Sequence, residues 1–380
     1  MSDLLDKCID REILDDIIQK DGVIPQNIKF FLFQMRKGAL LMKQATLVAP
    51  KTFEINEVPV PQIAPNQALI KVRAVGICGS DIHAYYGKHP FMSCPITLGH
   101  EASGDVVEIG ADVKGIKIGD RVVMRPQKIC KTCSLCKSGR YNICKSLEVL
   151  GCQCAGACSD FYAVDADLLY RIPDDADYDV GTVIEPLAVG VHAVRRAGDI
   201  TGMNVLVIGA GTIGNVVAQS AKALGAASVM VSDVSEFKLN MAKECGVDHI
   251  VNVAKEDLAQ VINDAYGEDG VDVVFECSAN PNALNQLLDI GRKGITMVIV
   301  GVYGGLANIN MANVQDREYN LVGTLMYLHE DYVTAIELVA NKKVDLKTLI
   351  TREFPLEEIA DAYHYIENNK DEAQKVILTV

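Results

Sequence analysis

The sequence has 380 residues, of which 49% are hydrophobic and 23% are charged, and its formal net charge is −14. This length exceeds one ordinary hydrophobic core and predicts two domains. The acidic balance argues against nucleic acid or an anionic membrane as the main partner, and no apolar run reaches the length of a spanning helix. The N-terminus lacks a secretory signal, so the twelve cysteines favour metal binding over disulfides and predict a cytoplasmic location.

Residues 1–41 are predicted to be a separate N-terminal extension. Apolar side chains recur at helical spacing from Leu4 to Ile17 with acidic residues between them, which predicts an amphipathic helix. Such a helix could mediate oligomerisation or docking. Alternatively, the extension packs on the body of the protein, or it precedes a natural start of translation at Met42.

From Met42 onward, short β-rich segments predict an all-β body, a partly open barrel. These segments are residues 68–75, 104–110 and 119–123. Strands then alternate with helices, which predicts a parallel sheet covered on both faces. The predicted strands of that sheet are residues 204–208, 228–233, 271–276 and 295–300. Helical periodicity returns at 335–339 and 356–366, before a strand at 375–379.

A glycine-rich turn joins the first of these strands to a helix. Gly209, Gly211 and Gly214 form a GxGxxG pattern, and Asp233 follows 19 positions after the last glycine. The glycines permit a tight turn, close approach of the pyrophosphate and close helix packing, while the helix N-terminus faces the phosphates. Asp233 would accept hydrogen bonds from the ribose hydroxyls and favours NAD over NADP, a preference that Lys238 softens. The alternative is a glycine-rich turn without a ligand.

The expected cofactor-binding positions also include residues near this turn and at the ends of the later strands. The full set is Gly209, Gly211, Thr212, Ile213, Gly214, Asp233, Lys238, Cys277 and Val300.

Four cysteines lie within fifteen residues. Cys130, Cys133, Cys136 and Cys144 have a Cys-x2-Cys-x2-Cys-x7-Cys spacing. Four thiolates can close a tetrahedron around one zinc ion and leave no position for substrate, which predicts a structural site. Free thiols or an iron–sulfur cluster are the alternatives. The nearby Cys152, Cys154 and Cys158 have no second partner set and are interpreted as ordinary free cysteines.

A second candidate metal site combines Cys78, His100 and Glu101. A thiolate, an imidazole and a carboxylate are the mixture that zinc accepts. Glu101 directly follows His100, so on an extended chain it would point to the opposite face and could ligate only where the backbone turns. Glu185 is the other carboxylate candidate. Taken alone, His100 could be a core histidine.

These residues carry a resemblance to a known family. Gly99-His100-Glu101-x2-Gly104-x5-Gly110-x2-Val113 resembles the signature of the zinc-containing alcohol dehydrogenases of the medium-chain dehydrogenase/reductase family. Residues 184–193 are similar to the polyol branch, typified by sorbitol (L-iditol) dehydrogenase, because Glu185 stands where the alcohol-dehydrogenase branch has a cysteine. The resemblance covers residues 42–380 and leaves out the N-terminal extension.

The resemblance implies a two-domain α/β fold. A GroES-like β-barrel catalytic domain would span residues 42–190 and be completed by 325–380, with a Rossmann NAD-binding domain at 191–324. It implies two zinc ions per chain, a structural one and a catalytic one held by Cys78, His100 and Glu101. Glu185 would either bind the catalytic zinc or hold its water. The assembly would be a homotetramer or homodimer.

The family chemistry is hydride transfer from a secondary alcohol of a polyol or sugar alcohol to NAD+, giving a ketose-type product. Ser80 and His83 would pass the proton from the substrate oxygen to solvent. Tyr85 and Tyr327 are the expected substrate contacts. The chain departs from the polyol branch at Met326, where an arginine that contacts the sugar would stand. Losing that fork of donors changes which hydroxyls can be held.

Two other functions stay open at this point. One is a dehydrogenase of another vicinal hydroxyl substrate, such as a 2,3-diol, L-threonine, an inositol or a sugar acid. The other is a non-catalytic redox sensor that binds NAD and zinc. The proton relay at Ser80 and His83 argues against the sensor, which does not need one.

Overall fold

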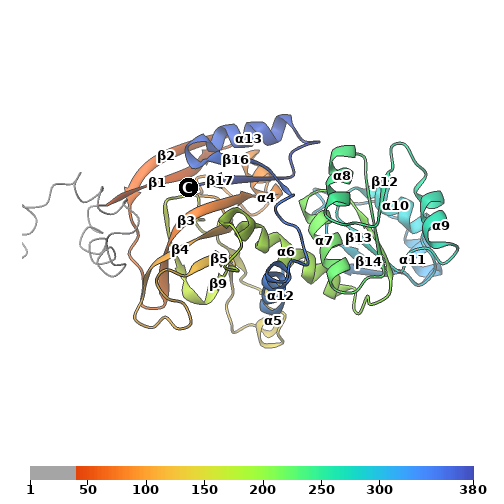
Figure 1. The fold of residues 1–380 in the computed structure, drawn as a ribbon, viewed down its shortest axis with the longest axis horizontal. Helices are drawn as coiled ribbons and strands as arrows, with labels where there is room; N and C mark the ends of the chain where they lie inside the picture. Colours follow the sequence, from red (N-terminus) through yellow and green to blue (C-terminus); the bar gives the residue numbers. More distant parts are fainter. Residues whose placement is uncertain (1–39) are drawn as a thin grey trace, which may run out of the picture.

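A computed structural model of the protein describes residues 40–380 (Figure 1). The predicted amphipathic helix between Leu4 and Ile17 lies outside the described residues. Two bodies of different architecture lie side by side, a β-rich one and an α/β one, with helices between them.

The β-rich body is built on a seven-stranded sheet that brings distant parts of the chain together. Its path is β16–β17–β3–β4–β5–β9, and β8 also pairs with β3. All pairs are antiparallel except β16 with β17. The strands are β3 (Gln67–Ile77), β4 (Glu101–Ile109), β5 (Arg121–Met124), β8 (Phe161–Asp165), β9 (Leu169–Arg171), β16 (Ile350–Pro355) and β17 (Lys375–Thr379). Figure 1 shows the late strands β16 and β17 beside the early strand β3.

Alternating apolar side chains explain why these strands form a core. In β3, Ile70 and Val72 face a cluster that also contains Val106 of β4 and Met124 of β5. A hairpin of β1 (Leu41–Ala49) and β2 (Thr52–Pro59) contributes Leu47 to this cluster. Burial of this face against the hairpin fixes the register, since a slip of one residue would expose every core side chain.

The α/β body is a six-stranded sheet in which every strand runs parallel to its neighbours. The strand order is β12–β11–β10–β13–β14–β15. The strands are β10 (Asn204–Ile208), β11 (Ser228–Asp233), β12 (His249–Asn252), β13 (Val273–Glu276), β14 (Thr296–Ile299) and β15 (Asn320–Gly323). The order reverses between β10 and β13, and ligands of such sheets bind at that switch point. The predicted two-domain α/β fold with a doubly wound parallel sheet is confirmed.

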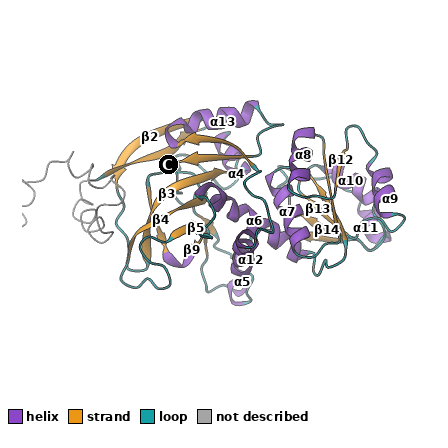
Figure 2. Cartoon of the chain, viewed as in Figure 1, coloured by secondary structure: helices purple, strands orange, loops and turns teal. Residues whose placement is uncertain are grey.

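The helices of the α/β body cover its sheet (Figure 2). They are α7 (Thr212–Ala223), α8 (Glu236–Glu244), α9 (Leu258–Tyr266), α10 (Pro281–Ile290) and α11 (Met311–Asp316). Leu206 and Met230 from the sheet form one buried cluster with Leu284 and Leu287 of α10. Val205 and Val207 pack with Val217 of α7 on the other face. Strands buried on both faces explain the continuous apolar runs in the sequence.

Two long helices connect the bodies. Helix α6 (Tyr178–Arg196) packs on β3, β4 and α7, and α12 (His329–Ala340) packs on α6. Ile184 and Leu187 of α6 share a buried cluster with Tyr332 of α12. Helix α6 thereby places the side chains of its buried face between the two bodies.

The remaining elements are short. They are α4 (Gly79–Tyr85), β6 (Gln127–Lys128), α5 (Ser134–Lys137), η1 (Tyr141–Ile143), β7 (Glu148–Val149), η2 (Ala166–Leu168), η3 (Leu356–Glu358) and α13 (Ile359–Asn368). Within residues 40–380, no helix has both the length and the apolar character needed to cross a membrane. The eleven cysteines of this range are all free thiols. The domain boundaries at residues 190, 191, 324 and 325 stay predictions.

Candidate active site

Three side chains with metal-binding atoms converge where β3 ends and β4 begins. Cys78 directly follows β3, His100 precedes β4, and Glu101 is its first residue. Their ligand atoms all lie within 4.8 Å of one another, with His100 and Glu101 buried and Cys78 half-buried. A thiolate, an imidazole and a carboxylate in this arrangement leave one position of a zinc tetrahedron open. The donor set therefore fits a zinc ion of the catalytic type.

His100 and Glu101 reach the same site although neighbouring side chains on a strand point to opposite faces. The reason is that β4 begins only at Glu101, so His100 lies outside the alternation of the strand. Asp81 supports the cluster: its Oδ2 accepts the Cys78 backbone N–H at 2.9 Å, and its Oδ1 lies 3.4 Å from His100 Nδ1. A carboxylate behind a ligating imidazole orients the ring toward the metal.

Glu101 is held by a buried lysine. The ammonium of Lys375, on β17, lies 2.8 and 2.7 Å from the two carboxylate oxygens of Glu101 and donates to the Ile77 carbonyl at 3.2 Å. The side chains of Lys375 and Glu101 are only 3% and 1% exposed. Gly76 makes room for them, because a Cβ there would lie 2.1 Å from Glu101 Oε2. The lysine therefore both neutralises the carboxylate and fixes its position.

A further buried carboxylate, Glu185, lies on α6. Its Oε1 accepts a hydrogen bond of 2.6 Å from the hydroxyl of Tyr327, and both residues are buried. Burial and the charge of Glu101 raise the pKa of Glu185 to about 7, against the opposing effects of His100, Tyr327 and Lys375. Glu185 does not belong to the set whose ligand atoms converge within 4.8 Å.

The short helix α4 carries the two predicted proton-relay residues. Ser80 and His83 lie three residues apart, which places them on one helix face. Ser80 is half-buried and His83 is exposed, so the pair runs from the metal cluster outward. Tyr85, predicted to contact substrate, is instead 1% exposed and packs against Phe53 and Tyr363 in the barrel core. The ring of Tyr85 is part of the apolar core of the β-rich body, so we do not include Tyr85 in the proposed site.

The four-cysteine lobe has the geometry of a closed metal site. The sulfur of Cys130 lies 3.9 Å from Cys136 and 3.5 Å from Cys144, and Cys133 lies 4.0 Å from Cys144. A zinc tetrahedron with bonds of about 2.3 Å has sulfurs separated by roughly 3.8 Å. Backbone N–H groups point at the sulfurs and lower the pKa of Cys130 to about 5. The four sulfurs are therefore arranged for one zinc ion.

The glycine-rich turn between β10 and α7 has the shape of a dinucleotide cradle. Gly209 has a φ of 94°, a conformation that favours glycine. A Cβ on Gly214 would lie 1.7 Å from the Gly209 carbonyl oxygen, whereas a Cβ on Gly211 would meet no atom within 4 Å. The chain therefore needs the third glycine for its own packing and the second for an approaching ligand. Thr212 and Ile213 form the first turn of α7.

The other expected cofactor residues surround this turn. Asp233 ends β11, and its carboxylate accepts the N–H groups of Ala210, Val234 and Ser235. These three bonds leave about one acceptor site on the carboxylate for a ribose hydroxyl. Cys277 follows β13, and Val300 follows β14. Lys238 is half-buried in the first turn of α8.

The residue before Lys375 reaches the cofactor turn. Gln374 donates through Nε2 to the Ala210 carbonyl at 2.8 Å, and its own carbonyl accepts the Thr212 hydroxyl at 2.7 Å. Two consecutive residues thus contact the dinucleotide turn and the metal cluster. Gln374 and Lys375 therefore connect the two halves of the site, the dinucleotide turn and the metal cluster, through adjacent residues.

A cavity of about 500 Å³ has a wall that adjoins the metal cluster. Thr46, Ser93 and Thr97 line it with hydroxyl groups, and Cys152 lines it with a thiol. Cys152 also hydrogen-bonds His100, which joins the cavity to the cluster. The sequence predicted an ordinary free cysteine at this position, and the structure adds that this thiol lies next to a candidate ligand.

Sequence reasoning missed Asp81, Gln374 and Lys375. Asp81 stands three residues after Cys78, where an acid can accept the N-cap N–H of a helix, and that spacing could have identified it. Lys375 opens the otherwise apolar run Val376-Ile377-Leu378, and a charge in a buried strand requires a partner. Nothing in the sequence identifies that partner as Glu101.

Comparisons with known proteins agree with this geometry. Residues 64–174 match the family model described as the alcohol dehydrogenase GroES-like domain, and residues 212–341 match the zinc-binding dehydrogenase model. A sorbitol dehydrogenase of Bacillus subtilis is 35% identical over 343 residues, covering 89% of this chain and 97% of the relative.

Two solved structures have a similar fold. L-idonate 5-dehydrogenase from Escherichia coli has a TM-score of 0.83 at 30% identity and covers 90% of this chain and 99% of its own. 2R,3R-butanediol dehydrogenase from Bacillus subtilis has a TM-score of 0.82 at 30% identity, covering 89% and 99%. The predicted GroES-like and Rossmann folds are confirmed.

We expect Gly214→Ala and Gly211→Ala to separate folding from cofactor binding. Gly214→Ala forces a methyl group against the Gly209 carbonyl and should lower the free energy of unfolding by about 1–3 kcal/mol. Gly211→Ala meets no protein atom, so it should leave stability unchanged and weaken NAD binding. Thermal unfolding and NAD titration measure the two effects. Equal loss of stability in both variants would contradict this assignment.

We expect Lys375→Met to destabilise the protein strongly. It leaves the Glu101 carboxylate buried without its ion partner, which costs about 3–5 kcal/mol. Urea unfolding of the metal-free protein measures the loss, and adding Glu101→Gln to the same chain should restore part of it. Lys43→Met is the matched control, because Lys43 pairs with Glu357 on the exposed surface and should barely change the unfolding midpoint.

Proposed function

Because the chain belongs to the zinc-dependent medium-chain dehydrogenase/reductase family, we propose that it oxidises a secondary alcohol of a polyol or sugar alcohol with NAD+, giving a ketose-type product. The observation that carries the proposal is the convergence of Cys78, His100 and Glu101 beside a dinucleotide turn. A redox sensor that binds NAD and zinc would need neither an open position on its metal nor the proton relay of Ser80 and His83.

The proposed complement is two zinc ions per chain and one NAD. Cys78, His100 and Glu101 would hold the catalytic ion, and the four-cysteine lobe would hold the structural one. When bound, the catalytic zinc supplies Lewis-acid chemistry that lowers the pKa of a hydroxyl group, and NAD supplies the hydride acceptor. Glu185, held by Tyr327, is proposed to accept a hydrogen bond in the open position rather than to ligate at rest.

The proton of the substrate hydroxyl is proposed to leave through helix α4. Ser80 is half-buried two residues after Cys78 and is placed to accept it. His83 lies three residues further on the same face and is exposed, so it can deliver the proton to solvent. The short helix therefore carries one metal ligand at its N-cap and the relay along one side.

The cofactor preference is proposed to be NAD over NADP. The Asp233 carboxylate at the end of β11 would repel a 2′-phosphate and accept a ribose hydroxyl instead. Its three backbone hydrogen bonds hold it in place. Lys238 lies on the next helix and moderates the preference without reversing it.

The substrate is proposed to be a polyol whose hydroxyls enter the cavity beside Cys152. Thr46, Ser93 and Thr97 offer hydroxyl partners there. Tyr327, bound to Glu185, stays an expected substrate contact. Met326 has no hydrogen-bond donor where the polyol branch uses an arginine. A second candidate is therefore another vicinal hydroxyl substrate, such as a sugar acid or a 2,3-diol, the classes named in the two similar structures.

We also propose that the chain works in the cytoplasm as a homodimer or homotetramer. Strand β15 is the edge of the parallel sheet, and exposed apolar side chains lie in the segments around it, at Val302, Leu306 and Leu325. An apolar edge of this kind is suited to pairing with a second copy.

Metal analysis with an NADH-absorbance assay tests the proposal. We expect two zinc ions per chain and NADH formation with at least one polyol. Cys78→Ala should lose one zinc and lower kcat by about a thousandfold or more, while the fold stays intact. Zinc-free protein that still forms NADH would overturn the proposal.

Cys133→Ala distinguishes the two metal sites. It opens the lobe, so we expect loss of the other zinc and a lower thermal midpoint rather than loss of the catalytic metal. Unfolding curves with and without a chelator measure the change. A normal midpoint in Cys133→Ala would show that the lobe does not depend on its metal.

A substrate panel identifies the hydroxyl class. We expect the highest kcat/KM with a polyol and lower values with sugar acids, inositols and 2,3-diols. Met326→Arg should raise kcat/KM for longer polyols by about tenfold, because it adds a fork of donors. Unchanged ranking in Met326→Arg would show that this position does not face the substrate.

A further inference from the structure

The turn that carries Tyr327 is held in a strained conformation. Tyr327 lies between β15 and α12 and is fully buried, with its hydroxyl on Glu185. Met326, the residue before it, has a φ of 49°, in the left-handed region that non-glycine residues avoid. Such a conformation persists only where surrounding contacts hold it. The contacts that hold this turn therefore decide where the hydroxyl of Tyr327 points.

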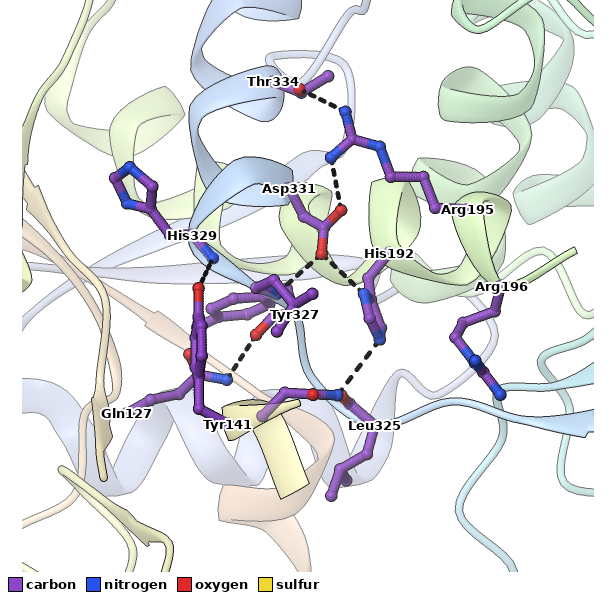
Figure 3. Close-up of polar contacts among 12 residues, drawn as sticks. Gln127, Tyr141, His192, Arg195, Arg196, Leu325, Tyr327, His329, Asp331 and Thr334 are labelled. Atoms are coloured by element: carbon purple, nitrogen blue, oxygen red, sulfur yellow. Dashed lines mark hydrogen bonds and ion pairs between the residues drawn. The ribbon is translucent and has the colours of Figure 1, made fainter. Parts of the chain in front are cut away.

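Two side-chain amides hold the carbonyls on either side of Met326. Asn142 Nδ2 donates to the Leu325 carbonyl at 2.9 Å, and Gln127 Nε2 donates to the Tyr327 carbonyl at 2.9 Å. Both amides are buried. Figure 3 shows the bond from Gln127 below Tyr327 and the hydroxyl of Tyr141 on the backbone nitrogen of His329, where α12 begins. The turn is thus clamped on both sides.

The three residues that hold this turn, Gln127, Tyr141 and Asn142, lie near the two ends of the four-cysteine lobe, close to Cys130 and Cys144. Gln127 stands three residues before Cys130, and Tyr141 and Asn142 stand three and two residues before Cys144, in η1. The four sulfurs of the lobe lie within 4.8 Å of one another, so a zinc ion bound there would fix the two ends of the lobe relative to each other. Residues near the two ends of the lobe therefore contact the two sides of the turn, Gln127 at Tyr327 and Asn142 at Leu325.

The direction of the Asn142 amide is set by a buried histidine. His192 Nε2 lies 3.3 Å from Asn142 Nδ2, and His192 Nδ1 lies 2.7 Å from Asp331 Oδ2. Because Asn142 donates, Nε2 must accept, and the imidazole proton must sit on Nδ1 facing Asp331. Asp331 also accepts a hydrogen bond from the guanidinium of Arg195 through its Oδ1 (Figure 3). Its Oδ2 accepts the Leu328 N–H at 2.8 Å. This chain of partners leaves Asn142 one orientation, with its N–H groups on His192 and Leu325.

We propose that the four-cysteine lobe is a positioning element for the active site, acting through Asn142 and Gln127 on the turn that aims Tyr327 at Glu185. His192 is a positioning residue that orients Asn142. The lobe then does more than stabilise the fold, because closing its metal site sets the geometry of a carboxylate beside the catalytic cluster. The inference rests on the proposed role of Glu185 at that cluster.

A double-mutant cycle tests the proposal. Asn142→Leu should lower kcat about tenfold in the wild-type chain and less than twofold in a Tyr327→Phe background, because the hydroxyl it positions is then absent. Equal losses in both backgrounds, or an unchanged kcat in folded Asn142→Leu, would overturn it. Should Asn142→Leu fail to fold, Gln127→Met tests the same turn from its other side with the same expected outcomes.

Two histidine variants separate positioning from packing. His192→Gln keeps an acceptor for Asn142 and a donor for Asp331, so it should retain most of the activity. His192→Leu keeps only volume and should resemble Asn142→Leu. Similar losses in both variants would contradict the proposed role of His192. Asn285→Leu is the matched control, since this amide also holds a loop carbonyl, that of Asn308, but away from the site, and kcat should not change.

A spectroscopic readout keeps this test independent of turnover. With cobalt in the catalytic site and zinc in the lobe, Asn142→Leu and Tyr327→Phe should shift the visible cobalt bands in the same way, and Asn285→Leu should not. If no alcohol is oxidised but these shifts appear, the proposed function fails and the positioning role stands. If turnover is normal and Asn142→Leu leaves the bands and kcat unchanged, the positioning role fails alone.

Discussion

The buried ion pair between Glu101 and Lys375 is the interaction on which the site depends. Removing two charges from water is expensive, and the attraction between them offsets this only with good geometry and further hydrogen bonds. Here the ammonium reaches both carboxylate oxygens and the Ile77 carbonyl. The pair stands where β3, β4 and β17 meet, so the cluster can form only when all three strands are in place.

The same stretch of backbone also serves the cofactor. Gln374 bonds to Ala210 and Thr212 in the dinucleotide turn, while Lys375 bonds to Glu101. A displacement of this strand end would therefore disturb both half-sites together. Helix α6 makes a second connection, because it carries Glu185 between the bodies and receives the turn with Tyr327. The metal cluster of the β-rich body and the dinucleotide turn of the α/β body are thus joined by the start of β17 and by helix α6.

Local chemistry explains what the sequence could predict. Three sets of residues could be predicted because each is close in sequence or has a fixed spacing. They are the glycines of the dinucleotide turn, the four cysteines of the lobe, and Cys78, His100 and Glu101. The structure brings each set together. The parallel sheet was predictable because its strands are buried on both faces. The partners of these sets, such as Lys375 for Glu101 and Asn142 for Leu325, come from more than 180 residues away. No local pattern encodes such pairings. Nor does a local pattern show that the ring of Tyr85, an expected substrate contact, packs in the barrel core.

The chain order of the barrel has a consequence for synthesis on the ribosome. The α/β sheet uses strands from one continuous segment, β10 to β15, and can begin to form as soon as that segment has emerged. Strand β3 emerges much earlier, yet its neighbour β17 follows almost 300 residues later. Strand β8 can pair with residues 67–71 of β3 early, but residues 74–77 lack their partner strand and Glu101 lacks its counter-charge until β17 arrives. The nascent barrel therefore carries a partly unpaired strand and an unneutralised acid until residue 375 arrives, which makes the order of emergence a hazard for aggregation.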